Sequence, residues 1–446
     1  MHINISAYAK KYRDSLERLG TVMITLIKGG HVINPAAGVD GIFDVLIEDD
    51  IIKAVEPEIN TEAHQVIDAS GKLVMPGFID MHVHLREPGF EYKETIETGS
   101  MAAAVGGYTT ICPMPNTKPV IDSRCMVEYL KLKSEKEAAI NIIPVGSVTV
   151  GQMGEKLSDM EGMAKAGALA VSEDGKSVMD VLLYKEGMKL AKDNNLLVLA
   201  HCEDKVLVNG GVMNEGAKSR ELGLPGISNS VEDVITARDI LLAKETGARL
   251  HLCHCSTKDS VALVKFAKEI GADVTAEVCP HHFSMTEEEI TSDDGNFKMN
   301  PPLRSKEDVE ALKQGLKDGI MEVISTDHAP HGEEEKKGSM LKAPFGIVGS
   351  ETAFALTYTH LVKEGWLTLT QMVEKMSCNP ARILGIDKGN IAPGKTADIV
   401  IADIDEEYTI DASKFVSKGK NTPFDGHKVY GRVLMTFVSG EVVYEY

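Results

Sequence analysis

The sequence predicts an α/β protein, a (β/α)8 barrel of the TIM type beside a small β-sandwich formed from the N- and C-terminal segments. Strand-like and helical stretches alternate between residues 73 and 326, and this alternation is typical of βα units around a parallel barrel. Short apolar runs broken by glycines occupy residues 23–72 and recur from residue 386 to the end. Because neither terminal part is long enough for a core of its own, we expect the two to pair.

The expected elements follow this division in order. Residues 1–22 form an N-terminal extension without a clear role, 23–72 the first part of the sandwich, 73–385 the barrel and 386–446 the second part of the sandwich. Apolar runs predict barrel strands at 73–84, 108–114, 141–149, 168–173, 196–202, 249–255, 273–279 and 321–326. Helical periodicity predicts helices at 123–138, 178–193, 231–246, 260–270 and 306–317.

The composition of the chain limits the kinds of partner that the protein can bind. The chain of 446 residues carries a net charge of −20, which argues against nucleic acid or an anionic membrane as the main partner. No apolar run is long enough to span a membrane. The seven cysteines are scattered and odd in number, as reduced thiols are, so we expect a cytoplasmic protein. We also expect a small-molecule substrate and a homodimer.

Two histidines end the first barrel strand. Side chains alternate along a strand, so His82 and His84 share one face, and Pro88-Gly89 closes the strand as a turn. The carboxyl ends of barrel strands carry the chemistry of this fold class. The pair is therefore half of a candidate metal site.

Other strand ends supply further candidates. His201 ends the fifth strand, His254 lies near the end of the sixth, and Asp327 follows the eighth. The fourth strand ends in Glu173 and Asp174, and either acid could reach the metal. Imidazole and carboxylate ligands favour zinc, and one shared carboxylate could bridge two ions. A zinc knuckle built from Cys253, His254 and Cys255 is disfavoured because the three side chains would diverge.

Six motifs resemble one family. HVHLREPG at 82–89, PMPNT at 113–117, SEDG at 172–175, MNPPLR at 299–304, STDHAPH at 325–331 and APFGI at 343–347 are similar to those of dihydroorotases of the bacterial class I type, in the amidohydrolase superfamily. The resemblance covers nearly the whole chain from Met23. In many relatives a carboxylated lysine bridges the metals, but no lysine ends the fourth strand here.

The resemblance implies a set of site residues. One or two zinc ions, with two favoured, would be bound by His82, His84, Asp174, His201, His254 and Asp327. Substrate contacts would come from Arg86, Asn116, Asn300, His331, Pro344, Phe345 and Gly346. His281, His282 and His328 receive no role. The charged segment 332–342 is expected to be a solvated loop.

The implied reaction is the reversible hydrolysis of a cyclic amide in pyrimidine biosynthesis, between dihydroorotate and N-carbamoyl-L-aspartate. A metal-bound hydroxide would be the nucleophile and Asp327 the general base and acid. Arg86 suits a bidentate grip on the substrate carboxylate. The alternatives are a hydantoinase, dihydropyrimidinase or allantoinase, or a non-catalytic structural homologue. Docking onto another enzyme of the pathway is left open.

Overall fold

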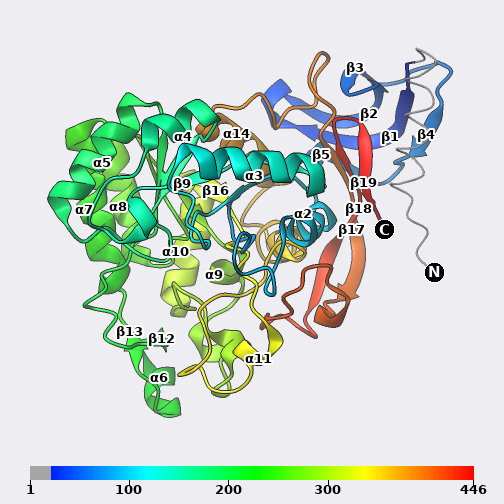
Figure 1. Ribbon diagram of the computed structural model, residues 1–446. Coiled ribbons are helices and arrows are strands. Elements are labelled where there is room, and N and C mark those ends of the chain that lie inside the picture. Colours follow the sequence, from blue (N-terminus) through cyan, green and yellow to red (C-terminus); the bar gives the residue numbers. More distant parts are fainter. Residues whose placement is uncertain (1–21) are drawn as a thin grey trace.

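A closed parallel barrel forms the larger part of the molecule. The structure, a computed structural model, describes residues 22–446 (Figure 1). Every pairing between neighbouring barrel strands is parallel. The strands are β6 (Phe78–Val83), β7 (Tyr108–Pro113), β8 (Asn141–Ile142) with β9 (Val145–Ser147), β10 (Ala170–Ser172), β11 (Leu197–Ala200), β14 (Leu250–Leu252), β15 (Val274–Val278) and β16 (Val323–Ile324). The His84 N–H donates to the His328 carbonyl at 2.8 Å, which joins the first strand to the segment after the last. The predicted barrel is confirmed.

Helices surround the barrel and include all five that the sequence predicts. These five are α3 (Arg124–Glu137), α5 (Val181–Asp193), α7 (Ser230–Thr246), α8 (Lys258–Glu269) and α10 (Lys306–Lys317). Helix α10 is an example of how the local sequence forms these helices. The Ser305 side chain caps its first turn by accepting from the Asp308 N–H. Leu312 and Leu316 are buried on the face of the helix toward the barrel.

Shorter elements fill the connections. They are α2 (Ile96–Val105), α4 (Met160–Ala166), β12 (Met213–Asn214), α6 (Ala217–Leu222), β13 (Gly226–Ile227), α9 (Pro280–Ser284), α11 (Glu333–Lys336), α12 (Ala353–Thr357), α13 (Leu369–Val373) and α14 (Asn379–Leu384).

The two ends of the chain pair beside the barrel, as the sequence predicts, and their strands form one sheet. Its strands are β1 (Ile24–Asn34), β2 (Val39–Glu48), β3 (Ile51–Glu56), β4 (Gln65–Asp68), β5 (Leu73–Pro76), β17 (Ile399–Thr409), β18 (Lys428–Val438) and β19 (Glu441–Glu445). The antiparallel pair β5 and β17 joins the two halves, with Val74 opposite Ile401. Val45, Val74, Ile399 and Phe437 are fully buried in a core common to both halves. In Figure 1 the blue and red strands lie together beside the barrel.

The prediction of a single strand over 73–84 is wrong in one respect. Residues 73–76 form β5 of the terminal sheet, and the barrel strand β6 begins only at Phe78. Gly77 lies at the crossing, where its N–H donates to the Asp398 carbonyl at 2.9 Å. A Cβ at Gly77 would lie 2.2 Å from Cγ2 of Thr109, so only glycine fits this close approach. The chain therefore passes from sheet to barrel at this residue.

The charged segment 332–342 is not simply a solvated loop, so this expectation is also corrected. It contains the short helix α11, and the side chains of Lys336 and Met340 are 3% and 0% exposed. Glu333, Glu334 and Lys337 do face solvent. Composition describes the exposed side chains of the segment but not the two that are buried.

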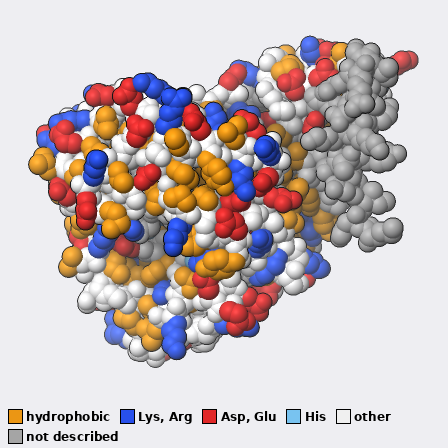
Figure 2. Space-filling view, in the orientation of Figure 1, with side chains coloured by type: hydrophobic (Ala, Val, Ile, Leu, Met, Phe, Trp, Pro, Cys, Tyr) orange, Lys and Arg blue, Asp and Glu red, His pale blue; other side chains and the backbone are white. Residues whose placement is uncertain are grey.

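The surface carries mixed charges. Figure 2 shows Lys and Arg side chains interspersed with Asp and Glu over the face of the barrel seen in Figure 1. Among residues 22–446, no helix has both the length and the apolar character needed to cross a membrane. The N-terminal extension predicted for residues 1–22 lies outside the described residues, apart from Val22.

Candidate metal centre and substrate cavity

The six predicted ligands meet at the carboxyl end of the barrel. His82 and His84 come from the first strand and the turn after it, and the others follow β10, β11, β14 and β16. Nε2 of His82 lies 3.1 Å from Oδ1 of Asp174, and Nε2 of His84 lies 3.1 Å from Oδ1 of Asp327. Nδ1 of His201 lies 2.9 Å from Nε2 of His254. All six side chains are buried: His82, His84, Asp174, His201, His254 and Asp327.

These residues fit a metal ion. Nδ1 of His201 and Nε2 of His254 converge on the centre, at 3.7 and 4.0 Å from Oδ1 of Asp174. Nε2 of His82 is buried beside them and has no hydrogen-bond partner among the described residues. Such an orphaned nitrogen is costly unless another group, such as a cation, takes its lone pair. Donor atoms lie within 4.8 Å of one another in two overlapping groups, one of His82, Asp174 and His254, the other of His82, His84 and Asp327. The donors therefore suit one ion or a pair.

The charge states of the two carboxylates and of His254 suit metal binding. His82 differs, because burial lowers its pKa but Asp174 and Asp327 raise it well above its usual range. Burial alone would raise the pKa of Asp174, but the nearby His82, His84 and His201 hold it well below its usual range. Histidines likewise lower the pKa of Asp327 against the effect of burial. Burial, together with His201 and His82, lowers the pKa of His254 to about 3. The two carboxylates are thus ionised and His254 is neutral at pH 7, as metal ligands must be.

The backbone bends sharply where it presents the site. His254, Asp327 and Arg86 all have positive φ, at 32°, 50° and 61°. Residues other than glycine rarely adopt this conformation, and it clusters at functional sites. The strained turns direct three side chains toward the end of the barrel.

The geometry separates the two adjacent acids. Asp174 Oδ1 and Oδ2 lie 3.1 Å from His82 Nε2 and 3.5 Å from His84 Nε2, so this carboxylate lies between both ligands of the first strand. Glu173 faces Thr149 instead and accepts from its N–H at 3.0 Å and from its hydroxyl. The structure thus places Asp174 in the centre and Glu173 outside it.

The sequence analysis did not identify Glu277, which hydrogen-bonds to two of the candidate ligands on the side away from the cavity. Its Oε1 lies 3.0 Å from Nδ1 of His82, and its Oε2 lies 3.0 Å from Nε2 of His251. The His254 N–H also donates to Oε1, at 3.2 Å. A carboxylate behind a ligating histidine fixes the ring orientation and tautomer. The signal in the sequence is an acid in the middle of the apolar strand β15.

Asn116 contacts two ligands. Its Oδ1 lies 3.0 Å from Nδ1 of His84, and its Nδ2 donates to Oδ2 of Asp174 at 3.2 Å. The same residue lines the cavity above the centre. It is thus placed to orient ligands in addition to the substrate contact that the resemblance implies.

A cavity of about 140 Å³ opens over the centre. Five of the predicted substrate residues line it together with every candidate ligand except His82: Arg86, Asn116, Asn300, Phe345 and Gly346. His331 stands behind them, with Nε2 2.8 Å from the Phe345 carbonyl and 3.3 Å from Nη2 of Arg86. Neither His331 nor Pro344 lines the cavity, so both are placed to support the lining residues.

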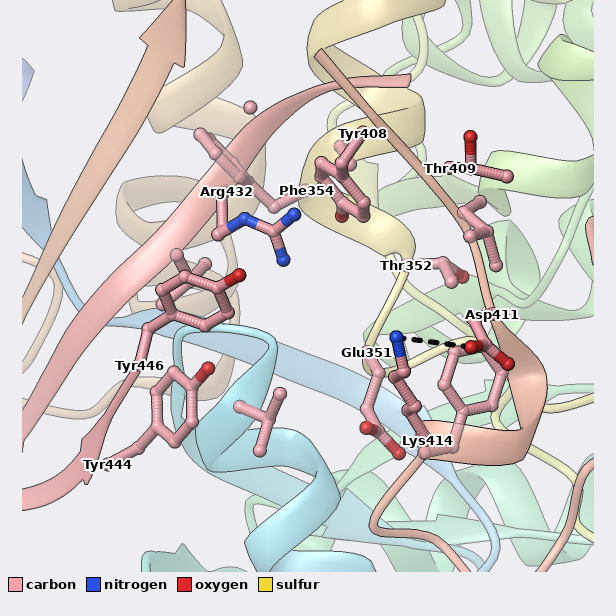
Figure 3. A pocket seen from close by; sticks show the side chains of 16 residues that line it. Glu351, Thr352, Phe354, Tyr408, Thr409, Asp411, Lys414, Arg432, Tyr444 and Tyr446 are labelled. Carbon is pink, nitrogen blue, oxygen red and sulfur yellow. Dashed lines mark ion pairs between the residues drawn. The ribbon is translucent and has the colours of Figure 1, made fainter. Parts of the chain in front are cut away.

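Another cavity, of about 240 Å³, lies between α12 and the strands β17 to β19 (Figure 3). The guanidinium of Arg432 lies over the rings of Tyr408 and Tyr446, at 3.9 and 4.4 Å from their centroids. The described residues that line this cavity include no histidine and no cysteine. The clustered histidines and carboxylates therefore lie at the smaller cavity and not at this one.

Barrel, buried ligands and cavity together define an amidohydrolase. The family described as "Amidohydrolase family" matches residues 336–444, and the one described as "Dihydro-orotase-like" matches residues 71–260. A dihydroorotase of Acetivibrio thermocellus is 48% identical over 94% of this chain and 98% of its own length. A dihydroorotase of Staphylococcus aureus is 49% identical over 94% of this chain and 99% of its own. The chain belongs to the dihydroorotase family.

Solved structures with a similar fold include a hydantoinase and a dihydropyrimidinase. An L-hydantoinase from Arthrobacter aurescens has a TM-score of 0.85 at 28% identity, over 94% of this chain and 96% of its own. A dihydropyrimidinase from Brevibacillus agri has a TM-score of 0.83 at 25% identity, over 95% of both chains. The fold is thus common to several cyclic amidohydrolases, whereas the dihydroorotases are much closer in sequence.

Replacing His254 with alanine should remove a ligand without removing packing that the barrel needs. We expect bound metal to fall and turnover to drop by about 100-fold or more, with the melting temperature of the metal-free protein nearly unchanged. Elemental analysis beside steady-state kinetics measures both. His360→Ala, at a half-buried histidine outside the centre, is the control. Full metal content and normal turnover in His254→Ala would show that His254 is not a ligand.

The two neighbouring acids should behave differently. Asp174→Ala should abolish turnover or metal binding, because its oxygens lie between the histidines of the first strand. Glu173→Ala should reduce activity by less than about tenfold, because it removes a bond to Thr149 and no ligand. Metal content and turnover are measured for both variants. A severe loss in Glu173→Ala with a mild one in Asp174→Ala would identify Glu173 as the ligand instead.

Proposed function

We propose that this cavity binds dihydroorotate and N-carbamoyl-L-aspartate and interconverts them by adding or removing water. The observation that carries the proposal is a single cationic group, Arg86, lining a cavity whose floor is the metal centre. The Arg86 Nε donates to the Pro330 carbonyl at 3.1 Å, which fixes the plane of the guanidinium. Its Nη1 has no hydrogen-bond partner among the described residues. A planar, charged donor held in this way suits a substrate carboxylate.

The ligand set would hold zinc, and we favour two ions with Asp174 between them. When bound, the metal would polarise the amide carbonyl and make water acidic enough to serve as a nucleophile at neutral pH. Imidazole nitrogens and carboxylate oxygens without a converging thiolate support this choice of metal.

Asp327 would carry the proton. Its carboxylate lies 3.1 Å from His84 Nε2 and borders the cavity, and His82 and His84 keep it ionised against the effect of burial. It would accept a proton from the attacking water and deliver it to the ring nitrogen as the amide C–N bond breaks. In the opposite direction it would take the proton from the ureide nitrogen and return it to the departing oxygen. One water is consumed or released per turnover.

The cavity walls would select the substrate. Asn300, Phe345 and Gly346 line the cavity, and the Asn300 side-chain amide can pair with an edge of a ureide. Gly346 has a φ of +130°, and a Cβ there would lie 2.7 Å from Cβ of Ala329. The left-handed backbone and the close approach of Ala329 therefore require glycine at this position of the cavity wall.

We further propose a cytoplasmic homodimer. Exposed apolar side chains on the outer faces of α5 and α7 support self-association: Leu182, Val234 and Leu241 are 69%, 50% and 56% exposed. Light scattering of the purified protein tests the dimer, and a monomeric mass at micromolar concentration would contradict it. Docking onto another enzyme of the pathway stays a prediction.

Turnover of L-dihydroorotate, hydantoin, dihydrouracil and allantoin by one preparation tests the proposed substrate. We expect dihydroorotate to have the highest kcat/KM, because only a carboxylate uses Arg86. Arg86→Met should lower this value by about 100-fold, since charge-assisted hydrogen bonds contribute about 1.5–3 kcal/mol, and should leave metal content unchanged.

Arg124→Met, at an exposed arginine, is the matched control. A preference for an uncharged ring, with no effect of Arg86→Met, would make the protein a hydantoinase or dihydropyrimidinase. Absence of turnover with all four compounds in the metal-loaded protein would favour a non-catalytic homologue.

A further inference from the structure

Lys336 is a buried cation in a segment whose composition suggests a surface loop. It lies at the end of helix α11 and is 3% exposed, whereas the side chain of its neighbour Lys337 is 60% exposed. The Lys336 ammonium donates to three backbone carbonyls: Lys298 at 3.0 Å, Pro344 at 3.0 Å and Gly346 at 2.8 Å. All three of its N–H groups are therefore used.

No carboxylate among the described residues lies within 4 Å of this ammonium. Burial lowers the pKa of Lys336 to about 7, and the positive charge of Lys298 adds to the effect. A buried charge without an opposite charge is expensive, and a hydrophobic side chain of similar volume often stabilises a protein as well or better. Packing alone thus does not explain a lysine at this position. The hydrogen bonds from its ammonium to the three carbonyls do explain it.

The carbonyls belong to two segments that line the substrate cavity. Lys298 lies two residues before Asn300, and Pro344 and Gly346 flank Phe345. Asn300, Phe345 and Gly346 all border the cavity. One further bond links the segments directly, from the Gly346 N–H to the Lys298 carbonyl at 3.0 Å.

Two more side chains hold the same arrangement. Nδ2 of Asn421 donates to the Gly346 carbonyl at 3.0 Å and to the Ala329 carbonyl at 3.1 Å. The Lys298 ammonium lies 4.4 Å above the Phe345 ring. Among these contacts, Lys336 alone bonds both segments through its side chain.

We propose that Lys336 is a positioning residue that holds the Asn300 segment and the Phe345 segment at the separation that the substrate requires. Lys336 does not line the substrate cavity, and its ammonium hydrogen-bonds to none of the six candidate ligands. Its effect reaches the substrate only through the backbone that it fixes. The inference rests on the proposed function, because it concerns the walls of that same site.

This arrangement predicts a particular kinetic signature. The metal ligands and Asp327 keep their positions without Lys336, so the chemical step should change little. The Asn300 and Phe345 segments would sample more conformations. Substrate binding would then have to order them, which weakens the affinity. Loss of Lys336 should therefore raise KM by about tenfold or more, with a much smaller change in kcat.

The experiment compares Lys336→Met, Lys336→Gln and Lys337→Met with the wild-type holoenzyme, using L-dihydroorotate. Methionine matches the length of the lysine stem but has no N–H donor, while glutamine keeps two. We expect the largest rise in KM for Lys336→Met, an intermediate one for Lys336→Gln and none for Lys337→Met. Metal content should be equal in all four proteins. Limited proteolysis between residues 333 and 342 should be faster in Lys336→Met than in Lys337→Met.

Several results would overturn the inference. One is a wild-type KM in a folded Lys336→Met or Lys336→Gln variant, and another is an equal rise in Lys336→Met and Lys337→Met. Failure of both Lys336 variants to accumulate as folded, metal-containing protein would assign the residue to overall stability instead. If the wild-type protein itself does not turn over dihydroorotate, the proposed function fails, and that outcome is distinct from all of these.

Discussion

The closure of the barrel at its carboxyl end is the constraint on which the site depends. Closure brings ligands from five strands to one point, although they are spread over 246 residues from His82 to Asp327. Asp80 secures the closure beside the ligands. It accepts from the Thr326 N–H at 3.2 Å and the Thr326 hydroxyl at 2.6 Å, and from the His82 N–H at 3.1 Å. The first and last strands are thus joined next to the residues they present.

Two carboxylates and four histidines are buried together at the centre, so their charges must compensate one another. The carboxylates stabilise protonated imidazoles, while metal binding needs the imidazoles neutral. Glu277 and Asn116 restrain two of the rings, so the donor nitrogens stay directed at the centre. The convergence of these ring nitrogens and carboxylate oxygens is the feature of the centre that best fits a metal ion.

Sequence periodicity was sufficient for the barrel and for the strand-end ligands. Each depends on local alternation, and His82, His201 and Asp327 could be placed from their own strands. The choice between Glu173 and Asp174 could not be made in this way, because it depends on Thr149, which lies on a neighbouring connection. The support from Glu277 likewise arises only when neighbouring strands pair.

Contacts between segments distant in the sequence also explain why the predictions for residues 73–76 and 332–342 had to be corrected. Whether residues 73–76 belong to the barrel depends on pairing with β17, which is more than 300 residues away in the sequence. The burial of Lys336 depends on three carbonyls from two other segments. The composition of residues 332–342 cannot predict these contacts. Short-range patterns predict elements well, but they do not predict which distant backbone groups an element meets.

Anomalous scattering at the zinc edge from crystals of the purified protein tests the central claim most directly. The account predicts one or two peaks about 2.0–2.2 Å from the histidine nitrogens and the Asp174 and Asp327 oxygens, with Asp174 between the peaks if there are two. A protein with full dihydroorotase activity and no anomalous peak at this centre, or with its metal at Cys279, His281 and His282, would contradict it.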